Sequence, residues 1–291
     1  MKTNLLPVVC AVAVLSGCAT VKEPAYDTLI AHRGESADAP ENTLPAYRTA
    51  VERGFGFECD IYLSKDGRLF TFHDYDLKRT TDGVHSELCT EASWEDVISK
   101  VNVGGWGKWK GSKFDPTRPV LLEEVLALAR PGRKIYVEVK GGDAAVAWVP
   151  TIRKVFASEP KATPDTVLLE CFSDKVCAEL KKAMPEYKVY WLTVGKGGKR
   201  GDKAHSSASA AELIATLRAC HADGVNVRFN YEAHDAAFVK QIKDAGFEFH
   251  VWVINDLKSA KRAFAIGADT LTTDRAKWIL DRYESEKREG E

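Results

Sequence analysis

The stretch "GFECDIYLSKDGRLFTFHD" (residues 56–74) decides how the strands of this chain are arranged. It contains two strand-like runs that are separated only by "SKDGR". A crossover between parallel strands needs a dozen or more residues, whereas Asp66 and Gly67 suit a tight turn. The stretch therefore predicts an antiparallel hairpin, which brings His73 back opposite residues 58–60.

Outside this hairpin, strand-like and helical segments alternate along the chain. With the hairpin included, the strand-like runs are 28–33, 56–63, 69–74, 134–140, 166–172, 188–194, 224–229, 247–254 and 269–274. Helical patterns cover 42–53, 121–130, 143–157, 174–183, 208–221, 235–245, 257–266 and 275–288. Such alternation over about 250 residues is typical of a (β/α)8 barrel or a doubly wound sheet. Because the hairpin uses one of the nine strands, eight remain to close a distorted (β/α)8 TIM barrel.

One segment interrupts the alternation. Residues 75–120 follow the third strand and are rich in glycine and aromatic residues, as in "VGGWGKWKG". We predict a small subdomain inserted there, which caps one end of the barrel.

The amino-terminal segment predicts export. Lys2 precedes an uncharged run, "NLLPVVCAVAVLSG", which is shorter than the roughly 20 residues of a membrane-spanning helix. The run ends in "LSGC", which resembles a bacterial lipoprotein signal with Cys18 as the lipidated first residue; an ordinary secretory signal is the alternative. We expect residues 1–17 to be removed, 18–26 to form a tether and 27–291 to form the barrel. The protein would then lie in the bacterial cell envelope, anchored to a membrane on its periplasmic side or at the cell surface.

Composition narrows the functional classes. Apolar residues make up 45% of the chain, which is enough for a large core, and the net charge of −1 provides no basic field for nucleic acid. Nothing in the sequence points to an obligate protein partner. Apart from Cys10 and Cys18, five cysteines remain, without C-x-x-C or Cys/His metal spacing. Their odd number leaves at least one thiol free within one chain, and a single disulfide stays open.

Two predicted strands carry charged pairs on one face. In "FECDIYL", Glu58 and Asp60 lie two residues apart and therefore share a face, and "YVEVK" repeats the pattern with Glu138 and Lys140. Inward groups near the carboxyl ends of barrel strands form the rim of an active site. A divalent cation with oxygen ligands would neutralise the carboxylates, with Glu138 as a third ligand, and Lys140 would meet an anionic substrate. Salt bridges across the barrel interior are the alternative.

Two histidines lie at predicted strand ends. His32 and His73 can each hold or give a proton near neutral pH. Arg33 offers a fork of donors for a phosphate, and Asn42 or Thr43 begins a helix whose amino end favours an anion. A cation, two histidines and two basic side chains suit phosphoryl transfer. One histidine would remove a proton from the nucleophile, and the other would protonate the departing alkoxide.

These motifs resemble the glycerophosphodiester phosphodiesterase family. The matching pieces, in the family's order from residue 31 to 274, are "AHRG", "PENTLPAY", "FECDIYLSKDG", "FTFHDYDLKRTTDG", "RPVLLEEVLALA", "YVEVK", "VWVIND" and "GADTLTTD". The resemblance implies a barrel with a small insertion and one divalent cation, calcium or magnesium. It also implies hydrolysis of glycerophosphodiesters to glycerol 3-phosphate and an alcohol, by attack of water or of the neighbouring glycerol hydroxyl. The residues that it implies are Glu58, Asp60 and Glu138 at the metal, His32 and His73 as the acid–base pair, and Arg33 and Lys140 at the phosphate.

The resemblance leaves other roles open. Trp252 would pack beside the glycerol moiety, with barrel-core packing as the alternative. Trp106 and Trp109 either line an alcohol pocket or, as we expect, only pack the insertion. We expect Asp74 and Arg79 to brace the end of their strand.

Three features depart from the family's pattern. Glu170 replaces a small polar residue, and it would either read a positive head group or pair with Lys188 or Arg228. The segment 195–209 is longer and more basic than expected, and "TTDRAKW" lacks the usual proline. The identity of the leaving alcohol therefore stays open.

Two other functions compete with this prediction. A related barrel enzyme would act on another phosphodiester or on an intact phospholipid. A catalytically silent barrel would bind a phosphodiester or a cell-wall polymer, but the full set of histidines and carboxylates argues against it.

Overall fold

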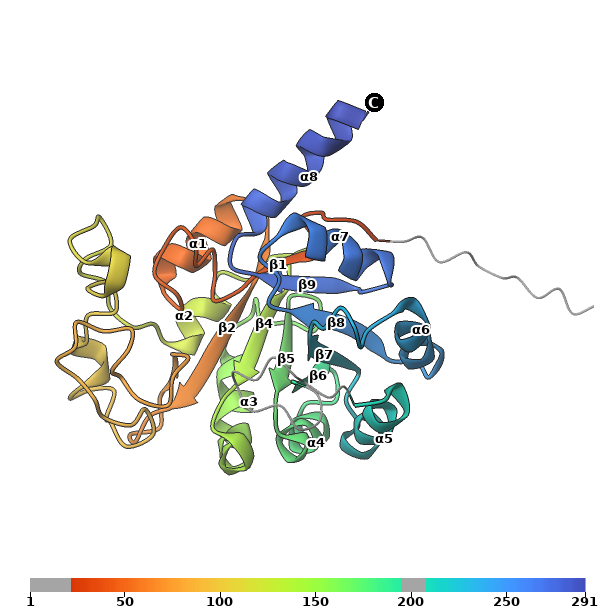
Figure 1. The fold of residues 1–291 in the computed structure, drawn as a ribbon. Helices are drawn as coiled ribbons and strands as arrows, with labels where there is room; N and C mark the ends of the chain where they lie inside the picture. Colours follow the sequence, from red (N-terminus) through yellow and green to blue (C-terminus); the bar gives the residue numbers. More distant parts are fainter. Residues whose placement is uncertain (1–21, 195–207, 291) are drawn as a thin grey trace, which may run out of the picture.

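A computed structural model describes residues 22–194 and 208–290, and in these ranges it confirms the predicted barrel. Eight parallel strands follow one another around the barrel, and the last of them pairs with the first (Figure 1). Their bounds are β1 Leu29–Ala31, β2 Gly56–Leu63, β4 Ile135–Val139, β5 Val167–Cys171, β6 Val189–Thr193, β7 Gly224–Arg228, β8 Glu248–Trp252 and β9 Thr270–Thr273. The predicted signal peptide, Cys18 and nearly all of the basic segment after β6 lie outside the described residues.

The ninth strand forms the predicted hairpin. Strand β3 (Leu69–Thr71) pairs antiparallel with β2, and Gly67 in the turn between them has a φ of 81°. Glycine adopts this left-handed conformation without steric cost. Phe72 donates its backbone N–H to the carbonyl of Asp60 at 3.0 Å, so the chain still follows β2 when it reaches His73. Strands β1 and β3 are shorter than predicted, and His32 and His73 lie just beyond them.

Helices cover the outside of the barrel (Figure 1). Their bounds are α1 Leu44–Glu52, α2 Leu122–Leu126, α3 Val149–Ser158, α4 Asp174–Ala183, α5 Ala210–Cys220, α6 Ala236–Asp244, α7 Leu257–Ala265 and α8 Ala276–Gly290, with short 3-10 turns at Ile98–Lys100, Gly107–Trp109 and Gly142–Trp148. Five helices begin at a side chain that accepts a hydrogen bond from the first turn: Thr43, Ser173, Ser209, Asp235 and Asp256. These caps explain why the predicted starts lie close to the observed ones.

The insertion after β3 lies beside the carboxyl end of β2 (Figure 1). Within it, Trp109 packs edge-on against Phe114 at 5.5 Å, and Trp106 donates to the carbonyl of Val103. The two tryptophans therefore pack the subdomain, as expected. Arg79 ties the insertion to the β1–α1 loop through an ion pair with Glu41 at 2.7 Å.

The barrel interior changes character along its axis. At one level it is filled by Ile30, Tyr136, Leu168 and Tyr190, which form a buried cluster of their own. Nearer the carboxyl ends of the strands, buried carboxylates take over. The five cysteines of the described ranges are all buried free thiols. No helix among the described residues has the length and hydropathy needed to cross a membrane.

Candidate active site

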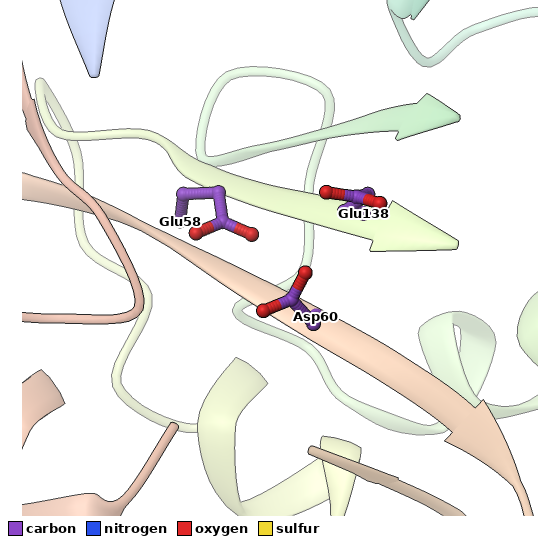
Figure 2. A group of neighbouring side chains, drawn as sticks. All are labelled: Glu58, Asp60 and Glu138. Carbon is purple, nitrogen blue, oxygen red and sulfur yellow. The ribbon is translucent and has the colours of Figure 1, made fainter. Parts of the chain in front are cut away.

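Three carboxylates converge on neighbouring strands, Glu58 and Asp60 along β2 and Glu138 near the end of β4 (Figure 2). Glu58 and Asp60 share one face of β2, and Glu138 stands opposite Asp60 in the parallel pairing of the two strands. One oxygen of each residue lies within 4.8 Å of the others. All three side chains are buried. The pattern of alternating charged residues in the sequence thus produces the predicted cluster.

The donor set fits a hard divalent cation. Glu58 Oε1, Asp60 Oδ1 and Glu138 Oε1 are buried and accept no hydrogen bond of good geometry. Lys140 supplies the nearest positive charge, with its Nζ 2.6 Å from Glu138 and 3.2 Å from Asp60. Three buried carboxylates beside two basic side chains, Lys140 and Arg33, retain surplus negative charge, which is costly away from water. Oxygen ligands of this kind are those that calcium and magnesium prefer.

The protonation of the three acids reflects this crowding. Burial, together with the charge of Asp60, raises the pKa of Glu58 well above its usual value. Burial raises the pKa of Glu138 to about 7, even though Lys140 opposes the shift. Burial acts on Asp60 in the same direction, but the charges of Lys140, His73 and Arg33 together outweigh it and hold the pKa of Asp60 below its usual range. The carboxylate cluster is therefore strained electrostatically and favours a cation.

Asn42 holds Asp60 in place, a role that the sequence analysis missed. Its Nδ2 donates to Asp60 Oδ2 at 2.7 Å, and its Oδ1 accepts from the backbone N–H of Asp60 and from the hydroxyl of Tyr47. Asn42 has a φ of 56°, a conformation that asparagine tolerates better than most residues. Of the two predicted helix caps, Thr43 is the one observed. Asn42 instead orients a candidate metal ligand.

Each predicted catalytic histidine is oriented by an aspartate. His32 Nδ1 lies 2.6 Å from Asp274 Oδ1, and His73 Nδ1 lies 2.6 Å from Asp74 Oδ1. Such a carboxylate fixes the proton on Nδ1 and makes Nε2 the basic nitrogen. In His32 this Nε2 is 3.9 Å from Glu58. Asp74 thus acts on a histidine in addition to bracing its strand end through Arg79.

Asp274 was not predicted as a site residue, although its motif was visible. It lies just after β9, and β9 pairs with β1 where the barrel closes, so Asp274 meets His32 across 242 positions of sequence. Asn255 donates to Asp274 Oδ2 at 2.6 Å and fixes it in turn. The sequence signal for Asp274 was the aspartate that ends "TLTTD". This signal indicates a site residue only when the first and last strands are known to be neighbours in the barrel.

Burial lowers the pKa of both histidines. For His32, burial acts together with the positive charge of Arg33. For His73, burial outweighs the opposing influence of Asp60 and Asp74. The lowered pKa values favour the neutral ring, which suits the histidine that must accept a proton.

Arg33 crosses the mouth of the cluster in a strained backbone conformation. Its φ is 56°, and its backbone N–H donates to Glu58 Oε2 at 2.9 Å. Its guanidinium lies 2.7 Å from Glu41 and 3.3 Å from Asp60. Positive φ in a residue other than glycine is uncommon and marks sites where the surroundings impose the conformation. Here two carboxylates hold the guanidinium beside the candidate metal ligands.

A cavity of about 620 Å³ opens at this end of the barrel. It is lined by His32, Arg33, Glu58, His73, Glu138, Lys140, Glu170, Phe172, Leu192, Val194, Asn226, Arg228, Trp252, Val253 and Thr272. Every predicted site residue of the described ranges lines it except Asp60, which is fully buried. The cavity is in the size range of small-molecule sites.

The far wall of the cavity corrects one prediction. Glu170 accepts a hydrogen bond from Asn226 at 2.9 Å, whereas Lys188 pairs with Glu248, so the expected Glu170–Lys188 ion pair is wrong. Burial raises the pKa of Glu170 to about 8, against the effect of Asn226. Trp252 donates to the backbone carbonyl of Asn226 and lines the cavity.

The sequence matches the model of the glycerophosphoryl diester phosphodiesterase family over residues 32–277. The chain belongs to this family. The match includes every site residue described above, from His32 to Asp274. Membership identifies the chain as an enzyme, a phosphodiesterase of the glycerophosphodiester type.

Individual relatives agree with the family. The chain is 26% identical over 255 residues to a glycerophosphodiester phosphodiesterase of Bacillus subtilis, covering 84% of this chain and 82% of the relative. It is 40% identical over 113 residues to human glycerophosphodiester phosphodiesterase 1, but this covers only 38% of this chain and 33% of the relative.

Solved structures share the barrel. A phosphodiesterase from Oleispira antarctica, determined in complex with the product sn-glycerol-3-phosphate, has a TM-score of 0.74 at 24% identity, covering 88% of this chain and 96% of that one. A glycerophosphodiester phosphodiesterase from Thermotoga maritima has a TM-score of 0.64 at 20% identity, covering 88% and 97%. At these identities the likeness establishes the fold.

Proposed function

We propose that the protein hydrolyses glycerophosphodiesters to glycerol 3-phosphate and an alcohol, with a divalent cation, calcium or magnesium, and with His32 and His73 as the acid–base pair. One observation carries the proposal: two aspartate-oriented histidines, Arg33 and Lys140 share one cavity with Glu58 and Glu138, and Asp60 completes the carboxylate cluster from a fully buried position. The product named for the Oleispira antarctica relative agrees with this substrate class.

Glu58, Asp60 and Glu138 would hold the cation, because their buried oxygens converge within 4.8 Å of one another and the two neighbouring basic side chains, Lys140 and Arg33, leave the cluster with surplus negative charge. When bound, a divalent cation supplies Lewis-acid polarisation and neutralises charge on phosphoryl oxygens. Arg33 and Lys140 line the same cavity and place two further positive charges beside the phosphodiester. These residues orient the phosphorus centre and stabilise the charge that develops during the reaction.

The histidines would move the protons. One neutral imidazole accepts a proton at Nε2 from the nucleophile, whose oxygen forms the new bond to phosphorus. The protonated second imidazole gives its proton to the alcohol oxygen as its bond to phosphorus breaks. Asp274 and Asp74 stabilise the imidazolium form of their partners, so each histidine can alternate between the two states. The nucleophile is either water or the adjacent glycerol hydroxyl. In the second route the hydroxyl attack releases the alcohol and leaves a cyclic glycerol phosphate, which water then opens to glycerol 3-phosphate. A substrate lacking that hydroxyl separates the two routes.

Paired substrates test the histidines. A variant that lacks the general acid should lose turnover of glycerophosphocholine but recover much of it with a p-nitrophenyl ester, whose leaving group needs no proton. A variant that lacks the base should be slow on both. If His32→Ala and His73→Ala both retain near-normal turnover of both substrates, the acid–base assignment is wrong.

A second activity, on intact phospholipid, is the competing function because apolar Phe172, Leu192 and Val194 line the cavity and could contact acyl chains. Head-group release from glycerophosphocholine should exceed release from phosphatidylcholine. The opposite order would replace the proposed substrate class.

We also propose that the protein is exported and lipid-anchored through Cys18, on the basis of the "LSGC" pattern. Cys18→Ala should move the protein from the membrane fraction to the soluble fraction of the cell envelope. Continued membrane association of the variant would refute the anchor, and a soluble unmodified protein would favour an ordinary secretory signal.

A further inference from the structure

The cavity is divided into two unlike halves. The half formed by β1, β2 and β4 carries the histidines, the basic side chains and the three clustered carboxylates. The half formed by β5 to β8 carries a fourth carboxylate, Glu170, together with Phe172 and Trp252. Glu170 does not belong to the group of ligand atoms that lie within 4.8 Å of one another. It therefore needs a separate explanation.

Glu170 differs from the other cavity carboxylates in its partners. Glu138 has Lys140 at 2.6 Å, and the backbone N–H of Arg33 donates to Glu58. Glu170 is 2% exposed, and in the described part of the chain it has a hydrogen bond from the neutral amide of Asn226 and no ion pair. The oxygen of that amide is itself buried without a hydrogen bond. A carboxylate buried without a cation loses free energy that an arriving cation would recover.

Aromatic rings stand next to this carboxylate. Phe172 lies two positions after Glu170, at the rim, where its side chain is exposed. It meets Trp252 edge to face, with ring centroids 5.8 Å apart, and both rings line the cavity. A basic group already lies near this ring, because Lys140 Nζ is 6.0 Å from the centroid of Phe172. A carboxylate combined with aromatic faces is the chemistry that binds organic ammonium ions.

Arg228 also lines this half, in register with Trp252 on the neighbouring strand β8. It is two residues beyond Asn226 on β7, so it lies about 7 Å nearer the opening than Asn226 at the usual rise of a strand. Its side chain is exposed, whereas Glu170 and Asn226 are buried. Its charge is therefore screened by water, and the inner part of this half remains acidic.

We infer that Glu170, Phe172 and Trp252 form a subsite for a cationic amino-alcohol head group, which makes Glu170 a specificity-determining residue. This inference rests on the proposed function, because the amino alcohol is the group released when the phosphodiester is cleaved. Glycerophosphocholine and glycerophosphoethanolamine would be preferred over glycerophosphoglycerol and glycerophosphoinositol, whose head groups are uncharged.

Two measurements test the subsite. The first compares kcat/KM for glycerophosphocholine and glycerophosphoglycerol in the wild type and in Glu170→Gln, which keeps the shape and removes the charge. The choline-to-glycerol ratio should fall about tenfold in the variant. Glu248→Gln, the same substitution at the opposite end of the barrel, should leave the ratio unchanged. An equal loss on both substrates would assign Glu170 to the shared glycerol phosphate part and overturn the inference, as would an unchanged ratio.

The second measurement needs no variant. Choline should inhibit the wild-type enzyme at a concentration about tenfold lower than its uncharged carbon isostere, in which carbon replaces the nitrogen. Equal inhibition by the two compounds would overturn the subsite. Cation titrations of Glu170→Gln should give the wild-type activation midpoint, and a weakened midpoint would make Glu170 a metal ligand instead. Absence of turnover on all four substrates would refute the proposed function, a result that differs from every outcome above.

Discussion

The two ends of the barrel both carry histidine and glutamate, but their burial and partners differ. Glu248 at the amino end is partly exposed, whereas Glu58, Glu138 and Glu170 at the carboxyl end are buried. At the amino end, Glu248 accepts a hydrogen bond from Tyr190 at 2.5 Å and pairs with Lys188, and His250 Nδ1 is 2.7 Å from Thr270. At the carboxyl end, Glu58, Asp60 and Glu138 share two basic side chains, Lys140 and Arg33, and Glu58 Oε1 is buried without a hydrogen bond. The fold pairs the glutamate at the amino end, whereas the carboxyl end holds more carboxylates than basic side chains.

The pKa values express the same contrast. Burial raises the pKa of Glu248, but hydrogen bonds from His250, Lys188 and Tyr190 outweigh burial and lower that pKa below its usual value. Burial raises the pKa of Glu58, and the neighbouring carboxylates raise it further. The pKa values of two glutamates in one barrel therefore shift in opposite directions because their partners differ. The lowered pKa marks a residue that stabilises the fold, and the raised pKa marks a candidate functional site.

The largest expected effect separates the histidines of the two ends. His32→Ala or His73→Ala should lower kcat by about 10²–10⁴, the range for a lost general acid or base, with little change in unfolding free energy. His250→Ala should instead leave kcat within about threefold and cost about 1–3 kcal/mol of stability, because it removes a buried hydrogen-bonded ring. Steady-state kinetics and urea unfolding measure both. If His250→Ala lost activity while His32→Ala and His73→Ala lost only stability, the two ends of the barrel would not differ in function as described.

A second pair compares the glutamates. Glu58→Gln should abolish activation by calcium or magnesium, because it removes a charged ligand, and should leave the metal-free protein at least as stable as the wild type. Glu248→Gln should lower the unfolding free energy by about 1–2 kcal/mol and leave the activation curve unchanged. Calorimetric cation titration and denaturant unfolding check these outcomes. Unaltered cation binding by Glu58→Gln would remove that residue from the proposed metal site.

Much of the site at the carboxyl end was predictable from the sequence, because it depends on patterns within single strands and one short connection. Alternation within a strand assigns Glu58, Asp60 and Glu138 to inward faces, and the short "SKDGR" connection requires the hairpin that returns His73 to them. The partners that orient these groups were harder to predict. Asp274 reaches His32 only through barrel closure, which depends on register and not on any local pattern.

The hydrogen-bond partner of Glu170 in the cavity could not be predicted from the sequence either. An ion pair with Lys188 or Arg228 was one of two alternatives for Glu170, and the observed hydrogen-bond partner is Asn226. The Cα register places Glu170 beside Glu138 and Tyr190 on its neighbouring strands, and Asn226 reaches it from β7, two strands away. Contacts across an interior depend on strand tilt and side-chain length together, and alternation alone fixes neither.

A substitution at Asn42 should have a smaller effect on cation affinity. It changes the orientation of Asp60 without changing the charge of the site. Asn42→Gly removes both side-chain contacts to Asp60 but accepts the positive φ, and it should weaken cation affinity about 10–100-fold, as for other groups that support metal ligands. His221→Gly is a matched control, because His221 has nearly the same φ of 57° at the end of α5, away from the cavity. Equal cation affinities in the two variants would show that Asp60 does not depend on Asn42.

The smallest expected effect is in the pH dependence of stability. The pKa of Glu138 is raised to about 7 and that of Glu170 to about 8, above the usual value of a glutamate, so the folded state binds their protons more tightly than the unfolded state. Their contribution to stability is therefore complete below the usual glutamate pKa and is lost as pH rises through about 7 and 8. Glu248 has the opposite sign, since its lowered pKa gives stability that is lost only as pH falls.

With chelator present, the urea midpoint should therefore fall between pH 6 and pH 8.5, by an amount on the order of 1 kcal/mol in unfolding free energy. Saturating calcium should remove the decline, because a cation that binds only the folded state stabilises the ionised carboxylates. Glu170→Gln should reduce the decline without calcium, whereas Glu248→Gln should leave it intact. A midpoint that rises with pH in chelator would mean that the buried acids at the carboxyl end are satisfied by the fold alone, as Glu248 is at the amino end.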